Sequence, residues 1–141
     1  MITAVDTSVL LDVILEDPSY GAVSVAALRR ARGDGALIVC PVVWAEVRAA
    51  LTRPDAIGEV FGNAGIAFDP FDEEIANLAG DLWRVYRRQG GKRTALVPDF
   101  LVGAHAIVRA GRILSRDRGF LRNYFEGLIV VDPCAAPAGK R

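Results

Sequence analysis

The chain has 141 residues, enough for about one domain, and its 17 basic side chains balance 17 acidic ones. Residues 1–81 hold 5 basic and 13 acidic side chains (net −8), whereas residues 82–141 hold 12 basic and 4 acidic side chains (net +8). Because 15 of the basic residues are Arg, which suits bidentate phosphate contacts, an anionic partner is not excluded. Counting Gly and omitting Tyr, about 60% of the chain is apolar against a usual value of about 45–50%, which excludes a disordered chain and is sufficient for both a core and an apolar partner surface.

The first half of the chain begins with an apolar segment, MITAVDTS, which lacks the basic region of an export signal. We therefore expect a cytoplasmic protein. The longest apolar run, residues 36–45, is about ten residues long and falls short of the roughly 18 that span a membrane, so we expect no membrane contact. Apolar runs and helical periodicity predict strands over 2–6, 36–40 and 66–68, and helices over 7–15, 20–32 and 42–52.

The second half continues the alternation of helices and short apolar strands. The pattern predicts helices over 73–88 and 99–110, followed by strands over 112–115 and 128–131. Such an alternation predicts an α/β fold, with a parallel sheet covered by helices on both faces. We expect one domain over residues 1–132 and a flexible tail over residues 133–141.

The cysteines and the single histidine do not favour a site. Cys40 and Cys134 lie far apart without a partner at metal-ligand spacing, so we expect reduced thiols and no zinc site. Cys40 ends an apolar run and is expected in the core, and Cys134 in the tail. His105 stands in an apolar helical stretch, where a packing role is favoured over catalysis.

Two acidic residues follow predicted strands. Asp6 ends the first strand, and Asp117 comes directly after the strand over 112–115. Ligands of open parallel sheets bind outside the carboxyl ends of the strands, so both residues are candidates for a site. Simpler alternatives are a helix N-cap for Asp6 and a turn residue for Asp117.

Two further acidic residues lie on predicted helices. Glu46 shares a helix face with Val43 and Ala50, which places a carboxylate among apolar neighbours, where it needs a partner or a metal. Asp99 opens an apolar helix, and its alternative role is again an N-cap. Asp12, beside apolar residues on the first helix, is a weaker candidate for an outer-shell role.

The topology allows Asp6, Glu46, Asp99 and Asp117 to meet at one edge of the sheet. Carboxylates gathered there repel and raise one another's pKa unless a cation holds them, and an all-oxygen set suits Mg²⁺ or Mn²⁺. The sequence contains neither GxxxxGK[ST] nor a GxGxxG after a strand, which argues against a nucleoside triphosphatase or a dinucleotide-binding protein.

Four segments together resemble PIN-domain nucleases, and more narrowly VapC-type toxins of type II toxin–antitoxin pairs: VDTSVLLDV at 5–13, VVWAEV at 42–47, PDFLVGAHA at 98–106 and ILSRDRGFLRNYF at 113–125. The resemblance covers residues 2–132. It implies a three-layer α/β/α sandwich with a parallel five-stranded sheet. It also implies an acidic cluster of Asp6, Glu46, Asp99 and Asp117, with Ser8 and Ser115 in supporting positions.

The activity implied by the resemblance is that of a Mg²⁺- or Mn²⁺-dependent endoribonuclease, which hydrolyses RNA phosphodiester bonds with a metal-activated water. Asp6 and Asp99 are the first choices for metal ligands, completed by Glu46 and Asp117. The implied partners are an RNA substrate, a cognate antitoxin protein, a second copy in a homodimer, and a higher-order complex with the antitoxin.

Basic residues of the second half are candidates for contacts to RNA phosphates, with a solvated surface as the alternative. The candidates are Lys92, Arg93, Arg112, Arg116 and Arg118. Two other functions stay open: a PIN-type nuclease of RNA processing or DNA metabolism without an antitoxin, and a non-catalytic domain whose acidic cluster binds a metal or a partner.

Overall fold

The computed structural model describes residues 1–117 and 119–136. In these residues five strands form one all-parallel sheet in the order β3-β2-β1-β4-β5. The predicted parallel sheet is confirmed, and each predicted strand is present with its ends shifted by at most one residue. The strands are β1 (Ile2–Val5), β2 (Ala36–Val39), β3 (Ile66–Phe68), β4 (Arg112–Leu114) and β5 (Ile129–Val131).

Helices fill the connections between the strands of the described residues. Five of them were predicted: α1 (Thr7–Ile14), α2 (Gly21–Asp34), α3 (Pro41–Ala50), α5 (Glu73–Arg88) and α6 (Pro98–Arg109). Three were missed: the 3-10 helix η1 (Pro54–Ala56), α4 (Ile57–Ala64) and α7 (Phe120–Tyr124). The missed helices are short, and α4 carries two glycines, so a helical period barely develops in them.

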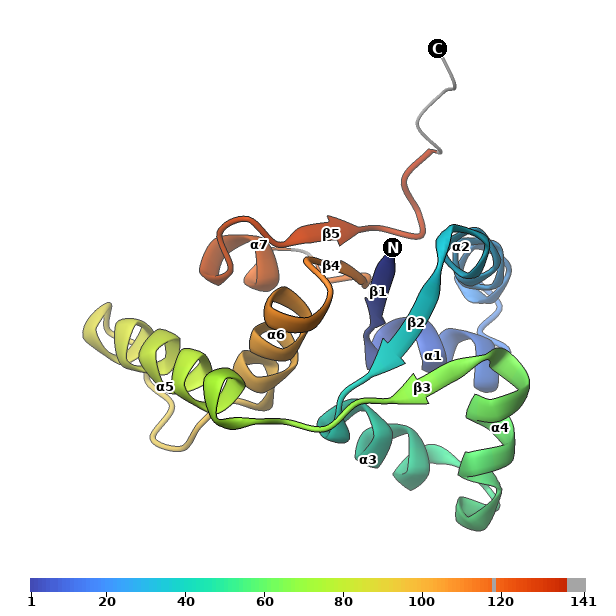
Figure 1. The fold of residues 1–141 in the computed structure, drawn as a ribbon, viewed down its shortest axis with the longest axis horizontal. Coiled ribbons are helices and arrows are strands. Elements are labelled where there is room, and N and C mark those ends of the chain that lie inside the picture. Colours follow the sequence, from blue (N-terminus) through green and yellow to red (C-terminus); the bar gives the residue numbers. More distant parts are fainter. Residues whose placement is uncertain (118, 137–141) are drawn as a thin grey trace.

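The order of the strands explains the layers. The chain moves from β1 to β2 to β3 in one direction and then returns to β4 and β5 on the other side of β1. Right-handed crossovers in opposite directions place their helices on opposite faces of a sheet. Figure 1 shows α5 and α6 on one side of the sheet and α2 on the other. The expected α/β/α sandwich is therefore confirmed.

An aromatic cluster fixes the start of α6. The side chain of Phe100 is fully buried and packs edge-on against Trp83 and Tyr86 of α5, with ring centroids 5.8 and 5.7 Å away. Phe120 and Tyr124 of α7 lie 5.0 and 5.3 Å from the same ring. Aromatic pairs of this kind each contribute about 0.5–1.5 kcal/mol beyond the area that they bury. The first turn of α6, which carries Asp99, is thereby anchored.

The C-terminal residues are described only in part. Cys134 is exposed, and the Ala135 N–H donates to the Asp132 carbonyl in a turn after β5. Residues 137–141 lie outside the described residues, so the predicted limits of the domain and the tail stay predictions. Among the helices of the described residues, none combines the length and hydropathy that crossing a membrane requires.

Gly103 of α6 allows the Phe125 ring, directly after α7, to pack closely against the helix. A Cβ atom at this position would lie 2.3 Å from Cε2 of Phe125. We therefore expect Gly103→Ala to lower the free energy of unfolding by about 1–3 kcal/mol in urea denaturation, because the Phe125 ring must move out of a filled core. Gly80→Ala on α5 is the matched control, since no atom lies within 4 Å of its Cβ position. An equal effect of the two substitutions would contradict this explanation.

Candidate active site

Asp6 lies at the end of the central strand, where its side chain has two tasks. Its Oδ1 accepts a hydrogen bond from the Thr7 N–H (2.8 Å), so Asp6 is the N-cap of α1, which was the alternative role predicted for it. Its Oδ2 accepts from the hydroxyls of Ser115 (2.6 Å) and Ser8 (3.4 Å). Burial raises the pKa of Asp6 and the charge of Asp117 adds to the rise, which outweighs the lowering by these three hydrogen bonds.

The register of the sheet brings Ser115 to Asp6. Val5 of β1 pairs with Leu114 of β4, so the residues that follow them are neighbours. Ser115 is buried, and its hydroxyl also accepts a hydrogen bond from the Asp117 N–H (2.9 Å). One hydroxyl therefore connects two of the four predicted carboxylate residues, and the supporting role of Ser115 in a site stays a prediction.

Glu46 lies on α3 with its side chain exposed, so the expectation of a carboxylate surrounded by apolar residues was wrong. Val43 on the same face is buried, but Glu46 lies at the border of that face. Its Oε1 accepts a hydrogen bond from the Thr7 hydroxyl (3.2 Å). Partial desolvation, followed by the charges of Asp6 and Asp99, raises the pKa of Glu46. The charge of Glu46 therefore interacts with those of Asp6 and Asp99.

Asp99 occupies the first turn of α6 with an exposed side chain. The N-cap of this helix is Val97 and makes no side-chain hydrogen bond, so the alternative role of Asp99 as an N-cap was wrong. Partial desolvation and then the charges of Asp6 and Asp117 raise the pKa of Asp99. The anchored start of α6 therefore places a carboxylate within electrostatic reach of two others.

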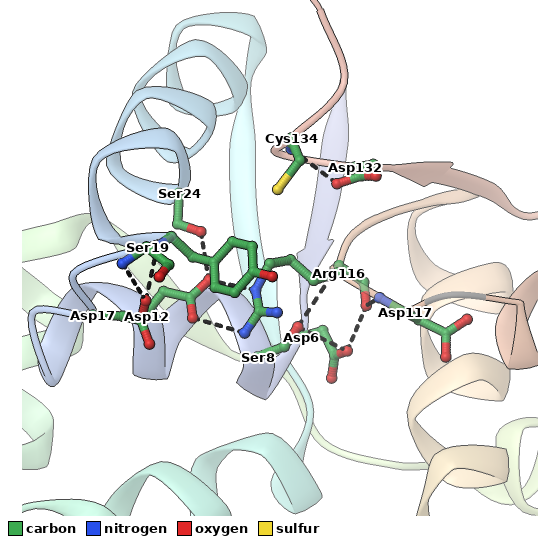
Figure 2. Close-up of polar contacts among 12 residues, drawn as sticks. Asp6, Ser8, Asp12, Asp17, Ser19, Ser24, Arg116, Asp117, Asp132 and Cys134 are labelled. Atoms are coloured by element: carbon green, nitrogen blue, oxygen red, sulfur yellow. Dashed lines mark hydrogen bonds and ion pairs between the residues drawn. The ribbon is translucent and has the colours of Figure 1, made fainter.

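Asp117 acts as a turn residue, which was the alternative role predicted for it. Its Oδ2 accepts hydrogen bonds from the N–H groups of Gly119 (3.1 Å) and Leu121 (2.9 Å). Figure 2 shows its carboxylate directed away from that of Asp6. Its charge nevertheless contributes to the raised pKa values of Asp6 and Asp99.

The chemistry of these donors fits a hard divalent cation, although the structure does not bring them to ligand spacing. All four side chains offer oxygen, the ligand atom that Mg²⁺ and Mn²⁺ prefer. Mutual repulsion contributes to the raised pKa values of Asp6, Glu46 and Asp99, which a cation would relieve. Within residues 1–117 and 119–136, however, no three Asp, Glu, His or Cys side chains are close enough to hold one ion together.

An ion pair between buried Asp12 and partly exposed Arg116, which the sequence did not reveal, joins α1 to the loop after β4. The side chain of Asp12 is 4% exposed, and Arg116 donates to it from Nε (2.7 Å) and Nη2 (2.8 Å). Ser24 of α2 adds a third hydrogen bond (2.7 Å), and the Arg116 guanidinium lies 4.0 Å from the centre of the Tyr20 ring. Figure 2 shows this network beside Asp6.

The same loop is tied to Asp6 through its backbone. The Arg116 N–H donates to the Ser8 hydroxyl (3.2 Å), which in turn hydrogen-bonds to Asp6. Asp12 therefore helps to fix Asp6 and Asp117 relative to each other. The signal in the sequence was a single carboxylate among the apolar residues of VLLDVIL, and it gave no hint of the partner.

The other predicted RNA contacts lie in different places. Arg112 begins β4, and it bonds to Thr3 (2.6 Å) and Asp34 (3.4 Å) at the edge of the sheet opposite the acidic residues. Lys92 and Arg93 are exposed in the loop that leads into α6 and so precede Asp99. Arg118 lies outside the described residues.

The expectations for His105 and Cys40 are confirmed. His105 is buried, and its Nε2 lies 2.8 Å from Oδ2 of Asp69, so the ring is a hydrogen-bonded part of the core. Burial lowers the pKa of His105, although Asp69 opposes the shift. Cys40 is also buried in the core.

A family model for the PIN domain matches residues 3–126. Since the match covers most of the sequence, the chain belongs to the PIN domain family. No protein of curated function matches the chain in sequence.

Solved structures share the fold. VapBC2 from Rickettsia felis, bound to a DNA fragment from its promoter, matches with a TM-score of 0.73 and 15% identity over 94% of this chain and 98% of that chain. VapBC-1 from nontypeable Haemophilus influenzae matches with a TM-score of 0.73 and 15% identity, over 96% of this chain and 100% of that chain. DNA-bound VapBC from Salmonella typhimurium matches with a TM-score of 0.69 and 14% identity, over 95% of this chain and 100% of that chain. At these identities the likeness establishes the fold alone.

The ion pair with Arg116 makes the fold sensitive to Asp12. We expect Asp12→Asn to lower the free energy of unfolding by about 1–3 kcal/mol in urea denaturation, because it removes the charge that accepts two hydrogen bonds from Arg116. The control is Asp55→Asn, whose pair with Arg53 is 77% exposed on both sides and should contribute less than about 1 kcal/mol. A loss no larger than in the control would show that the pair does not hold the loop.

The acidic residues should reduce stability where they are ionised. Their raised pKa values mean that the fold binds protons more tightly than the unfolded chain, so stability falls as the pH rises through these pKa values. We expect Asp99→Asn to raise the melting temperature by a few degrees at neutral pH without metal, and the gain to shrink as the pH is lowered.

Glu74→Gln is the matched control for Asp99→Asn. Glu74 lies in the first turn of α5 with an exposed side chain, so its neutralisation removes a favourable helix-dipole interaction without relieving the repulsion among the four acids. We expect a small decrease in its melting temperature. A melting temperature of Asp99→Asn that also decreases would contradict the proposed repulsion.

Proposed function

We propose that this PIN-domain protein is a divalent-metal-dependent endoribonuclease and the toxin of a type II toxin–antitoxin pair. The observation that carries the nuclease proposal is the connection of carboxylates at the end of β1: the Ser115 hydroxyl links Asp6 to the backbone of Asp117, and Thr7, next to Asp6, bonds to Glu46 of α3. The charge of Asp6 also contributes to the raised pKa values of Glu46 and Asp99. Gathering like charges lowers the stability of a domain, and groups perturbed in this way are concentrated at functional sites. Binding a cation at the edge of the sheet is such a function.

We propose Asp6 and Asp99 as the main ligands of Mg²⁺ or Mn²⁺, with Glu46 and Asp117 completing the set. When bound, the ion supplies an activated water and stabilises charge on the phosphate oxygens. The protein's own contribution is to keep the carboxylates oriented. Ser115 and Ser8 hold Asp6 by hydrogen bonds, and Thr7 does the same for Glu46.

The distribution of charge supports an anionic substrate. Lys92 and Arg93 are exposed in the loop that ends at α6, and Arg122 is exposed on α7 after Asp117. Positive side chains that precede Asp99 and follow Asp117 in the sequence favour a polyanion that would otherwise be repelled. We propose RNA as that polyanion. Arg112 has no part in this proposal, because it lies at the opposite edge of the sheet.

The proposed partners are a cognate antitoxin and a second copy of the chain. Large apolar side chains stay exposed in the described residues, among them Leu15, Phe68 and Ile129. They lie apart, at the end of α1 and on the two edge strands of the sheet, and do not form one patch, so the partner proposal rests on the solved complexes. The VapBC complexes with the same fold support an assembly with an antitoxin, in which the toxin would also form higher-order complexes.

Cleavage of RNA by purified variants tests the proposed activity. We expect the wild-type chain to cut cellular RNA in Mg²⁺ or Mn²⁺ and to be inactive in excess chelator. Asp6→Asn and Asp99→Asn should lower the rate by at least about a hundredfold, a usual cost of losing one group that stabilises transition-state charge. Gel analysis of the RNA, together with circular dichroism to verify folding, provides the measurement.

Glu74→Gln is again the control, and it should cleave RNA at the wild-type rate because it lies on the surface of α5. Undiminished cleavage in chelator would refute metal dependence. Stabilisation by Mn²⁺ without cleavage of any cellular RNA would instead support a non-catalytic metal-binding domain. Cleavage of DNA in preference to RNA would support a role in DNA metabolism.

A further inference from the structure

A pocket of about 320 Å³ adjoins the acidic residues on the side of the loop after β4. Its lining comes from the start of α2, this loop, α7 and the chain after β5, and consists of Tyr20, Arg116, Asp117, Arg122, Asp132 and Cys134. Figure 2 shows Asp132 and Cys134 on one side of Arg116 and Asp6 on the other. The pocket therefore shares Asp117 with the proposed active site and lies beside the place where a phosphodiester would be cut.

The two arginines of this pocket differ in what holds them. Asp12 orients the Arg116 guanidinium through Nε and Nη2, and Nη1 makes no hydrogen bond to the described residues. Arg122 is exposed, and its Nη2 donates to the Val130 carbonyl at 3.4 Å. One guanidinium held by a carboxylate and one exposed guanidinium on the same pocket suit contacts to a phosphate group.

The remaining side chains suit a nucleoside better than a bare anion. Tyr20 supplies an aromatic side chain: the Arg116 guanidinium covers one face of its ring at 4.0 Å, and the part that stays exposed is where a base or ribose ring packs. Asp132 accepts the Cys134 N–H with Oδ1 (2.8 Å), and its Oδ2 makes no hydrogen bond to the described residues. A carboxylate oxygen in this position accepts from a base amino or imino group, and together with Asp117 it weakens the attraction for a free phosphate ion.

We propose that this pocket is a subsite for one unpaired nucleotide adjacent to the scissile phosphate. Arg116 and Arg122 contact its phosphate, Tyr20 packs on the nucleoside, and Asp132 accepts from the base. A volume of about 320 Å³ holds one small ligand, so a base that stays stacked in a duplex does not enter. The proposal rests on the proposed nuclease function and assigns to it the residues of this chain that receive one unpaired nucleotide.

Cys134 provides a reporter for the occupancy of the pocket. Its thiol is exposed, whereas Cys40, the other cysteine of the chain, is buried. The rate at which N-ethylmaleimide modifies the full chain, followed by mass spectrometry, therefore measures access to the pocket. The probe is a short single-stranded 2′-O-methyl oligoribonucleotide, which resists cleavage, in the presence of chelator. Fluorescence anisotropy of the same labelled oligonucleotide measures binding independently.

We expect the single-stranded probe to slow the alkylation of Cys134 at least severalfold, and its duplex or inorganic phosphate to leave the rate unchanged. Arg122→Ala should abolish most of the protection, because it removes an exposed phosphate contact without disturbing the core. Arg53→Ala is the matched control. Its side chain is 77% exposed and does not line the pocket, so protection should persist.

Binding of the probe without protection of Cys134 would overturn the subsite, as would the absence of any binding. Equal protection by the duplex would overturn the preference for single strands. Cleavage of RNA in Mn²⁺ separates this inference from the proposed function. A chain that cuts RNA but shows no protection retains the nuclease function and loses the subsite. A chain that shows protection but never cuts RNA retains the nucleotide-binding pocket and loses the proposed activity.

Discussion

Asp6 places a negative charge in a largely desolvated position at the end of the central strand, and the surrounding elements either stabilise that charge or add to it. The Thr7 N–H and the hydroxyls of Ser8 and Ser115 stabilise it, whereas the carboxylate of Asp117 opposes its ionisation. Because β1 is the middle strand, the β2 side contributes Glu46 through α3 and the β4 side contributes Ser115 and Asp117. The acidic set therefore exists only once the whole sheet is folded.

Keeping like charges at one edge requires a rigid scaffold, and two interactions provide it. The ion pair of Asp12 and Arg116 fastens the loop after β4 to α1, and it joins residues 104 positions apart in the sequence. The aromatic cluster around Phe100 anchors the first turn of α6 beneath Asp99. Ion pairs of this kind are weak contributors to net stability, and we infer that this pair matters for which segments meet.

Much of the fold followed from local patterns, because parallel strands are short apolar runs and their carboxyl ends must share one edge. The same topology rule would have placed Arg112, the first residue of its strand, at the opposite edge. Helical periodicity indicated the face of Glu46 but not its distance from solvent, so its exposure was missed. The partner of Asp12 could not be found at all, because nothing in a single sequence couples it to Arg116.

The most direct test of the central claim is to locate Mn²⁺ by anomalous diffraction in crystals of the full chain grown with the ion. We expect one or two anomalous peaks at the carboxyl edge of the sheet, with the carboxylates of Asp6 and Asp99 drawn to coordination distance. This result would show that the raised pKa values of these residues belong to a cation site. Well-diffracting crystals with Mn²⁺ bound elsewhere, or with no peak at Asp6, would contradict the claim.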